Sequence, residues 1–74
     1  MSMRWTPERM DRLESAARRG LRVTIARRGS EYVVVARRLA VVNRQESFIG
    51  FLPMTGEELT FALDEIDAFE VIGL

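Results

Sequence analysis

The stretch LRVTIARRGSEYVVVARRLAVV (residues 21–42) decides the fold, because its apolar residues follow the period of β-strands. Large apolar residues occupy every second position over residues 21–25, which predicts a strand with one buried and one solvent-facing side. Turn-forming residues follow at 28–30, and a second run rich in β-branched residues starts at Tyr32. We therefore expect a β-hairpin in the middle of the chain.

A break in the second strand is expected at Arg37 and Arg38, after which the apolar run resumes over residues 39–42. Two adjacent arginines in a flat strand would point to opposite faces of the sheet, and one of them would enter the core. A β-bulge or a corner at this point leaves both guanidinium groups in water. Long strands with such a kink are what closes a small sheet into a barrel.

A helix is predicted at about residues 7–19, before the hairpin. Thr6 suits the N-cap, Pro7 the first helical position, and Gly20 the left-handed residue that ends a helix. The apolar residues of this segment fall on one narrow side, so the helix is expected to pack against the rest of the domain. Trp5, just before the cap, is expected to anchor the helix, and an exposed stacking aromatic is the alternative.

Three further strands are predicted after the hairpin, at about residues 47–52, 57–63 and 67–72. A 3₁₀ turn is expected just before the last of them. One helix followed by five short strands is typical of a mainly β domain with one N-terminal helix, an SH3-like or Sm-like small barrel of five strands. We expect a single domain over residues 1–74, with the barrel at about 21–72. A helix on an open five-stranded sheet is one alternative. A ferredoxin-like fold is another, but it needs a second helix, and no segment offers one.

The composition narrows the chemistry that is open to the chain. It contains no cysteine and no histidine, which excludes disulfides, thiolate zinc sites and nucleophiles activated by histidine. Asp64, Glu65 and Asp67 form an acidic cluster, but their spacing matches no recognised cation-binding loop, and pairing with arginine is the stronger expectation. We predict that the chain is not an enzyme and has no catalytic residue, no metal site and no cofactor.

Hydropathy and length indicate where the protein is located and whether it forms oligomers. No segment resembles a signal peptide, and no apolar run approaches the roughly 20 residues of a membrane span, so a cytoplasmic protein without membrane contact is expected. At 74 residues the chain is near the lower size limit for a single core. Formation of a homo-oligomer is therefore one expected route to additional buried area.

Charge is distributed unevenly although the net charge is zero. Residues 1–44 hold all eleven arginines and four acids, a balance of +7, and residues 45–74 hold seven acids and no base, a balance of −7. Such asymmetry indicates a charged partner. In a compact domain, however, strands from the two halves lie side by side, so cross-strand pairs of arginine and carboxylate are expected to neutralise much of this asymmetry.

The tripeptide Ala-Arg-Arg occurs three times, at residues 17–19, 26–28 and 36–38. The first copy is explained by the end of the helix, where cations face the negative end of the helix dipole. The second copy is placed at the hairpin tip, where solvated arginines are expected, and the third at the strand bend. Only the second and third copies can share a surface.

The segments RRGLRVTI, RRLAVV, ESFIGF and GEELTFALDEIDAFEVI lie within the stretch from Arg18 to Leu74 and resemble the WYL domain, an Sm-like barrel of bacterial transcriptional regulators. The last segment is also similar to the tail of the small Rho-inhibitor family, another Sm-like barrel preceded by one helix. The resemblance implies a role in regulating transcription, with polar and basic residues in contact with a ligand or nucleic acid. Glu46-Ser47-Phe48 replaces the Trp-Tyr-Leu triplet of the WYL domain, and Glu65 replaces the arginine of its Leu-Asp-Arg-Ile turn.

Two hypotheses of function remain open. The first is a regulatory binding module that offers arginines and a stacking aromatic to single-stranded nucleic acid, the transcription machinery or an acidic protein surface. Its candidate residues are Arg22, Arg27, Arg28, Arg37, Arg38, Arg44 and Tyr32. The second is a protein-interaction or homo-oligomeric assembly module without nucleic-acid binding, because the apolar segments 33–35 and 39–42 exceed what a small monomer covers. The four phenylalanines are assigned to the core in both cases: Phe48, Phe51, Phe61 and Phe69.

Overall fold

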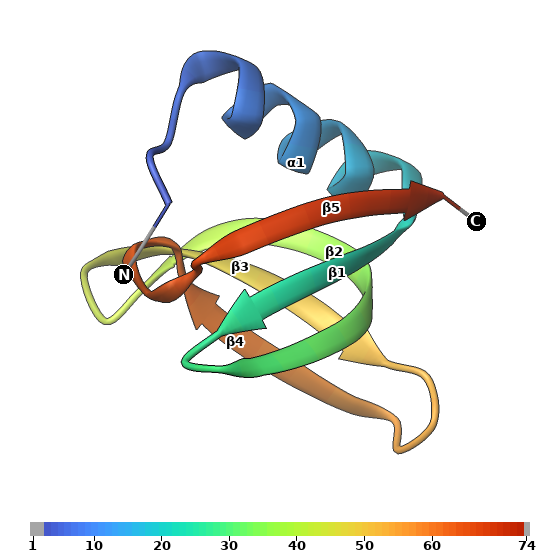
Figure 1. Cartoon of the computed structure of the whole chain (residues 1–74). Helices are drawn as coiled ribbons and strands as arrows, with labels where there is room; N and C mark the ends of the chain where they lie inside the picture. The colour runs from blue at the N-terminus through green and yellow to red at the C-terminus, as the bar shows by residue number, and fades with distance from the viewer. Residues whose placement is uncertain (1–2, 74) are drawn as a thin grey trace.

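Five antiparallel strands form one curled sheet, and a single helix packs against it (Figure 1). The computed structural model describes residues 3–73, so residues 1, 2 and 74 of the expected domain lie outside the described part. The elements are α1 (Pro7–Arg19), β1 (Arg22–Arg27), β2 (Ser30–Val42), β3 (Gln45–Leu52), β4 (Glu57–Ala62), the 3₁₀ turn η1 (Leu63–Glu65) and β5 (Ala68–Gly73). The predicted mainly β class with one N-terminal helix is confirmed.

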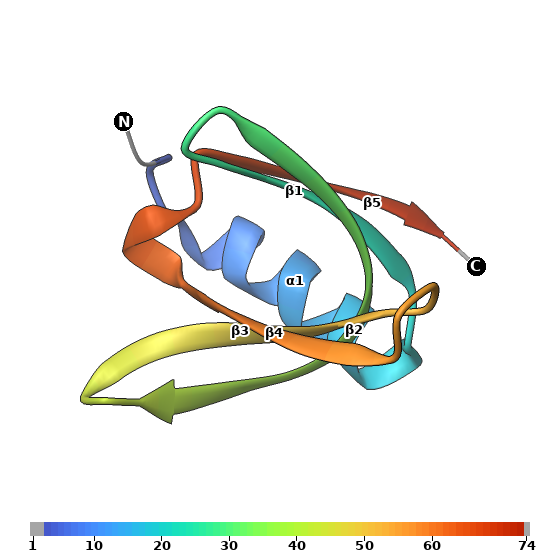
Figure 2. The same ribbon diagram turned by 90° about the horizontal axis from the view of Figure 1, so that it is seen from below.

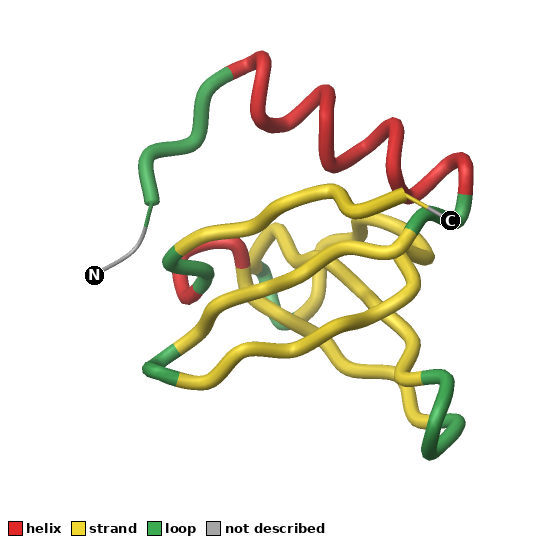
Figure 3. The backbone as a smooth tube through the Cα atoms, turned by 45° about the vertical axis from the view of Figure 1, so that its right-hand side comes forward, coloured by secondary structure: helices red, strands yellow, loops and turns green. Residues whose placement is uncertain are grey.

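Helix α1 begins and ends where the capping residues predict. The Thr6 hydroxyl accepts a hydrogen bond from the backbone N–H of Arg9 at 3.2 Å, and Gly20 ends the helix in the left-handed region with φ of 64°. Leu13 and Ala16 are the buried residues of the helix and face the sheet core. Figure 3 shows α1 crossing over one side of the curled sheet.

Trp5 anchors the segment before α1 to the 3₁₀ turn. Its indole Nε1 donates a hydrogen bond to the Leu63 carbonyl oxygen at 2.8 Å, and its ring stacks on Phe69 with the centroids 5.4 Å apart. The backbone N–H of Met3 donates to the Ile66 carbonyl oxygen at 3.0 Å. The anchoring role predicted for Trp5 is confirmed, and the exposed stacking role is wrong because Phe69 already occupies one face of the indole.

Strand β2 gives the sheet its curvature. Its residues 30–35 pair with β1, and its residues 35–42 pair with β3, within the strand order β4-β3-β2-β1-β5. The register shifts between Ala36 and Arg38, so the predicted bulge is confirmed, and it leaves both neighbouring arginines exposed. β4 and β5 are the two edges of the sheet and do not pair within residues 3–73, so closure into a barrel stays a prediction.

The core lies between the inner face of the curled sheet and α1. Its fully buried large side chains are Leu13, Val23, Ile25, Val34, Phe48, Phe61 and Ile66. Phe69 is half-buried against this cluster, but Phe51 is half-buried on the outer face, in register with Val35. The core assignment is therefore wrong for Phe51, because Phe48 and Gly50 take the inward positions of β3 and the alternation places Phe51 outward.

Close packing between β2 and β3 depends on Gly50. A Cβ atom at this position would lie 2.6 Å from Cγ2 of Val34, a buried core side chain. A two-residue loop connects β2 to β3, and its residues Asn43 and Arg44 have φ of 52° and 66°. Positive φ at both loop residues is the type I′ geometry, which extends the pairing to Gln45, two residues earlier than predicted.

Candidate functional site

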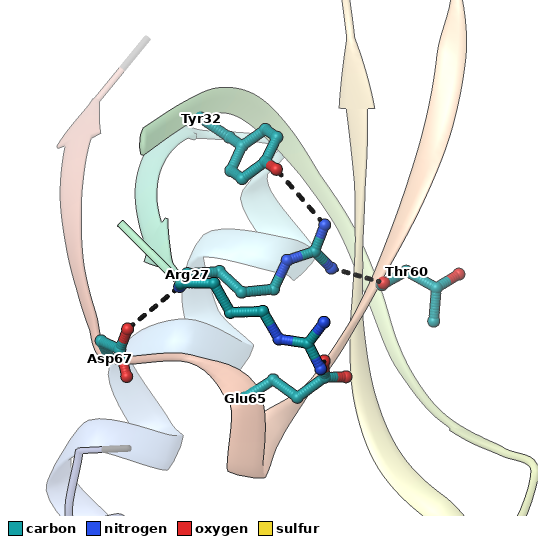
Figure 4. A network of polar contacts seen from close by, with 6 residues as sticks. Arg27, Tyr32, Thr60, Glu65 and Asp67 are labelled. Atoms are coloured by element: carbon teal, nitrogen blue, oxygen red, sulfur yellow. Dashed lines mark hydrogen bonds and ion pairs between the residues drawn. The ribbon is translucent and has the colours of Figure 1, made fainter. Parts of the chain in front are cut away.

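Arg27, at the end of β1, lies against aromatic rings. Its guanidinium carbon is 4.7 Å from the centroid of the Phe61 ring and 5.2 Å from that of Tyr32. Nη1 donates to the Thr60 carbonyl oxygen and Nη2 to the Tyr32 hydroxyl, both at 3.4 Å (Figure 4). The prediction of a merely solvated arginine is wrong for Arg27, because the edge-to-face pair of Tyr32 and Phe61 provides a surface for its planar group.

Arg28 connects the same hairpin tip to the segment after η1. Its backbone N–H donates to Oδ2 of Asp67 at 3.1 Å, and its Nη2 lies 2.7 Å from Oε2 of Glu65 (Figure 4). The backbone N–H of Asp67 in turn donates to the Ala26 carbonyl oxygen at 2.8 Å. The expected pairing of the acidic cluster with an arginine side chain is confirmed for Glu65. No group of carboxylates within residues 3–73 is arranged to hold a metal ion.

Arg37 and Arg38 lie on the outer face of the sheet at the bulge of β2. The guanidinium carbon of Arg37 is 4.6 Å from the Phe51 ring centroid, which explains why this outward ring is only half-exposed. Nη1 of Arg38 lies 3.6 Å from Oε2 of Glu58 on β4. Cross-strand pairing of arginine with carboxylate, expected from the charge asymmetry, is thus present here as well.

Arg22, Arg37 and Arg44 are the three candidates without a side-chain hydrogen bond or ion pair among the residues that the structure describes, and of these Arg37 lies on the Phe51 ring. Arg22 is exposed on β1 in register with Val35, which is itself in register with Phe51. Arg22, Val35 and Phe51 therefore form one cross-strand row on the outer face of the sheet, and Arg37 lies on the Phe51 ring of this row. Arg44 is exposed in the loop at the far end of the β2–β3 hairpin.

The contacts divide most of the seven predicted site residues into two groups. Arg27, Arg28 and Tyr32 gather at the β1–β2 hairpin tip, whereas Arg37 and Arg38 lie at the bulge. The contact partners of the tip are Tyr32, Phe61, Thr60, Glu65 and Asp67, and those of the bulge are Phe51 and Glu58. No contact partner among residues 3–73 is common to the two groups.

A groove that the arginine motifs did not indicate lies between α1, η1 and the free end of the β2–β3 hairpin. It consists of two adjoining hollows of about 290 and 410 Å³ that share Met10, Leu63 and Glu46. Leu39 adds to the apolar lining, and Val41, with 71% of its surface exposed, extends it toward the hairpin end. We call this surface the α1–β2 groove.

The border of the α1–β2 groove is acidic. Glu14 from α1, Glu46 from β3 and Asp64 from η1 line it, and no arginine does. Glu14 pairs with Arg18 at 3.3 Å, but this exposed pair on one helix leaves the carboxylate accessible to solvent. The sequence did carry one signal of this site, the apolar segment 39–42 that was expected to stay uncovered.

No family model matches the chain, and neither a curated protein nor a solved structure matches it. The resemblance to the WYL domain and to the Rho-inhibitor family therefore stays a prediction. Within residues 3–73, no helix is long and apolar enough to cross a membrane.

Proposed function

We propose that the chain is a non-catalytic regulatory binding module with an Sm-like small-barrel fold, and that its partner is a protein that docks in the α1–β2 groove. The observation that carries the proposal is the groove itself. Met10, Leu39 and Leu63 offer apolar surface at the border of the core, and Val41 continues this surface into solvent. Apolar surface bordered by polar groups is typical of protein interaction sites.

The course of β2 supports the small-barrel part of the proposal. One long strand pairs with β1 over residues 30–35 and with β3 over residues 35–42, so it belongs to both halves of the curled sheet. A single 3₁₀ turn connects the two edge strands, β4 and β5. Pairing of these two edges would remove both of them, which is the advantage of a barrel.

The contacts of the arginines favour a protein over nucleic acid. Binding of phosphates depends on basic groups that are gathered on one surface and free to release counterions. Here Arg28 and Arg38 pair with carboxylates, and Arg27 and Arg37 lie on aromatic rings in two separate places. Tyr32, the candidate stacking platform, is already in contact with Arg27 and Phe61.

Photo-crosslinking in the cells that make the protein tests the proposal. A photoreactive phenylalanine analogue replaces Val41 in the groove or, as the matched control, Val33, another exposed valine of β2 on the outer face. We expect a discrete crosslinked band at position 41 that protease removes and nuclease does not, and no such band at position 33. A band that nuclease removes, or no band at position 41, would contradict the proposal.

A further inference from the structure

The second part of β2 is an open strand edge. Pairing with β1 ends at Val35, and the backbone N–H of Ala36 donates to the Leu21 carbonyl oxygen at 2.8 Å. Beyond the bulge, residues 38–42 pair only with β3, and Figure 2 shows no strand on their other side. Among residues 3–73, no backbone hydrogen bond joins 38–42 to an element other than β3.

The loop geometry identifies which backbone groups are open. Val42 and Gln45 flank a two-residue loop, and such flanking residues form a hydrogen-bonded pair. Hydrogen-bonded and non-hydrogen-bonded pairs alternate along an antiparallel ladder. Leu39 and Val41 are therefore the residues whose N–H and C=O groups point away from β3, toward the open edge.

The open edge and the α1–β2 groove are parts of one surface, because the same two residues belong to both. Leu39 and Val41 line the groove, together with Met10 of α1. A peptide that adds a strand to an exposed edge obtains affinity from main-chain hydrogen bonds and specificity from pockets for alternate side chains. Both requirements are met at this end of β2.

The acidic residues of the groove favour an added strand that carries basic side chains. Glu14, Glu46 and Asp64 come from three different elements and border the apolar lining, with no arginine among them. A strand that alternates apolar residues with arginine or lysine would place apolar side chains in the groove and cations beside these carboxylates. An acidic strand would be repelled.

A second copy of this chain does not fit the groove. Its two sheet edges carry only acids as charged residues: Glu57 and Glu58 on β4 and Glu70 on β5. A symmetric pairing of two β2 edges would bring two acidic borders together, which costs energy. We therefore assign the complementary strand to another protein.

We infer that the α1–β2 groove binds an extended basic segment of a partner protein, which adds as a strand to the free edge of β2 at residues 38–42. This inference rests on the proposed function and specifies its partner by chemistry. The probe is a capped peptide of alternating arginine and valine, titrated at low salt into the ¹⁵N-labelled full chain. We expect amide shifts and slowed hydrogen exchange at Leu39 and Val41, with no slowing at Thr24 on the outer face of β1.

Two control peptides separate strand addition from simple charge attraction. A glutamate–valine peptide of the same length tests charge, and an arginine–valine peptide with proline in place of the central valine keeps the charge but loses a ladder N–H. We expect each to bind about tenfold more weakly or less, since several hydrogen bonds or charge contacts are lost. Equal binding by either control would overturn the inference.

A pair of triple variants tests the groove. Glu14→Gln/Glu46→Gln/Asp64→Asn neutralises the acidic border, and Glu31→Gln/Glu57→Gln/Glu70→Gln makes the same charge change at exposed positions elsewhere. At low salt we expect about tenfold weaker peptide binding for the first variant, from three modest charge contacts, and less than about twofold change for the second. Equal losses in both would overturn the inference.

Other occupants give different results. Protection of Leu39 and Val41 that rises with protein concentration, together with a dimer in light scattering, would identify a second copy and overturn the inference. Shifts of the same amides on addition of a single-stranded oligonucleotide alone, without the peptide, would also overturn it. A protein crosslink at position 41 without basic-peptide binding would reject the basic strand but leave the proposed function standing.

Discussion

The second and third Ala-Arg-Arg copies have the same sequence and different surroundings. At residues 26–28 the alanine is half-buried, one arginine lies between aromatic rings, and the other pairs with the segment after η1. At residues 36–38 the alanine is 1% exposed in the core, and both arginines lie on the outer face. Because the two tripeptides are identical, their different burial and contacts come from their positions relative to the strand pleat and the bulge.

The alanines provide the largest expected difference between the two copies. Ala36→Gln should lower the free energy of unfolding by about 3 kcal/mol or more, because a longer side chain with an unpaired amide enters a packed core. Ala26→Gln, the matched change at a half-buried strand position, should cost about 0.5 kcal/mol or less. Urea unfolding of both variants measures the difference, and similar costs would show that the two alanines have equivalent surroundings.

The first arginine of each copy should differ by a smaller amount. Replacement by methionine keeps the apolar stem and removes the guanidinium group. Arg27→Met should cost about 1–2 kcal/mol, because two ring contacts at ~0.5–1 kcal/mol each and two long hydrogen bonds are lost. Arg37→Met should cost about 0.5–1 kcal/mol, because it loses one ring contact.

Thermal unfolding of these two variants gives the ranking, with Arg27→Lys as the control. Lysine keeps the charge but lacks the planar group that stacks on Tyr32 and Phe61. We expect Arg27→Lys to fall between the wild type and Arg27→Met. A lysine variant as stable as the wild type would mean that charge alone accounts for the contribution of Arg27.

The second arginine of each copy should show the smallest effect. Double-mutant cycles for Arg28 with Glu65 and for Arg38 with Glu58 should give coupling energies of about 0.2–1 kcal/mol, as exposed pairs do. The first cycle should be the larger, because its atoms are 2.7 Å apart and Glu65 is 33% exposed, against 3.6 Å and 51% for Glu58. Both couplings should fall in 1 M salt, where the Debye length shortens to about 3 Å. A salt-independent coupling would point to a contact other than charge.

Local rules were enough to predict much of this fold. The ends of α1 follow from Thr6 and Gly20, and the bulge follows from two adjacent arginines in an apolar strand. Each of these features is determined by neighbours in sequence. They required no knowledge of which strands lie side by side.

The surroundings of Arg27 and the α1–β2 groove depend on contacts that are distant in sequence. The guanidinium of Arg27 donates to Thr60, 33 positions later, and such a contact needs the complete sheet order. The acidic border combines residues of α1, β3 and η1, so no linear motif contains it. Phe51 was misassigned because β3 has apolar residues at both parities, and alternation alone does not choose the inward set.

The close approach at Gly50 also limits how this sequence can change over time. A Cβ atom there would overlap the side chain of Val34, so positions 34 and 50 share one volume in the core. A larger residue at position 50 is tolerated only when position 34 has already become smaller, since overpacking destabilises a close-packed core. Evolutionary paths through this pair are therefore ordered: Val34 has to shrink before Gly50 can grow.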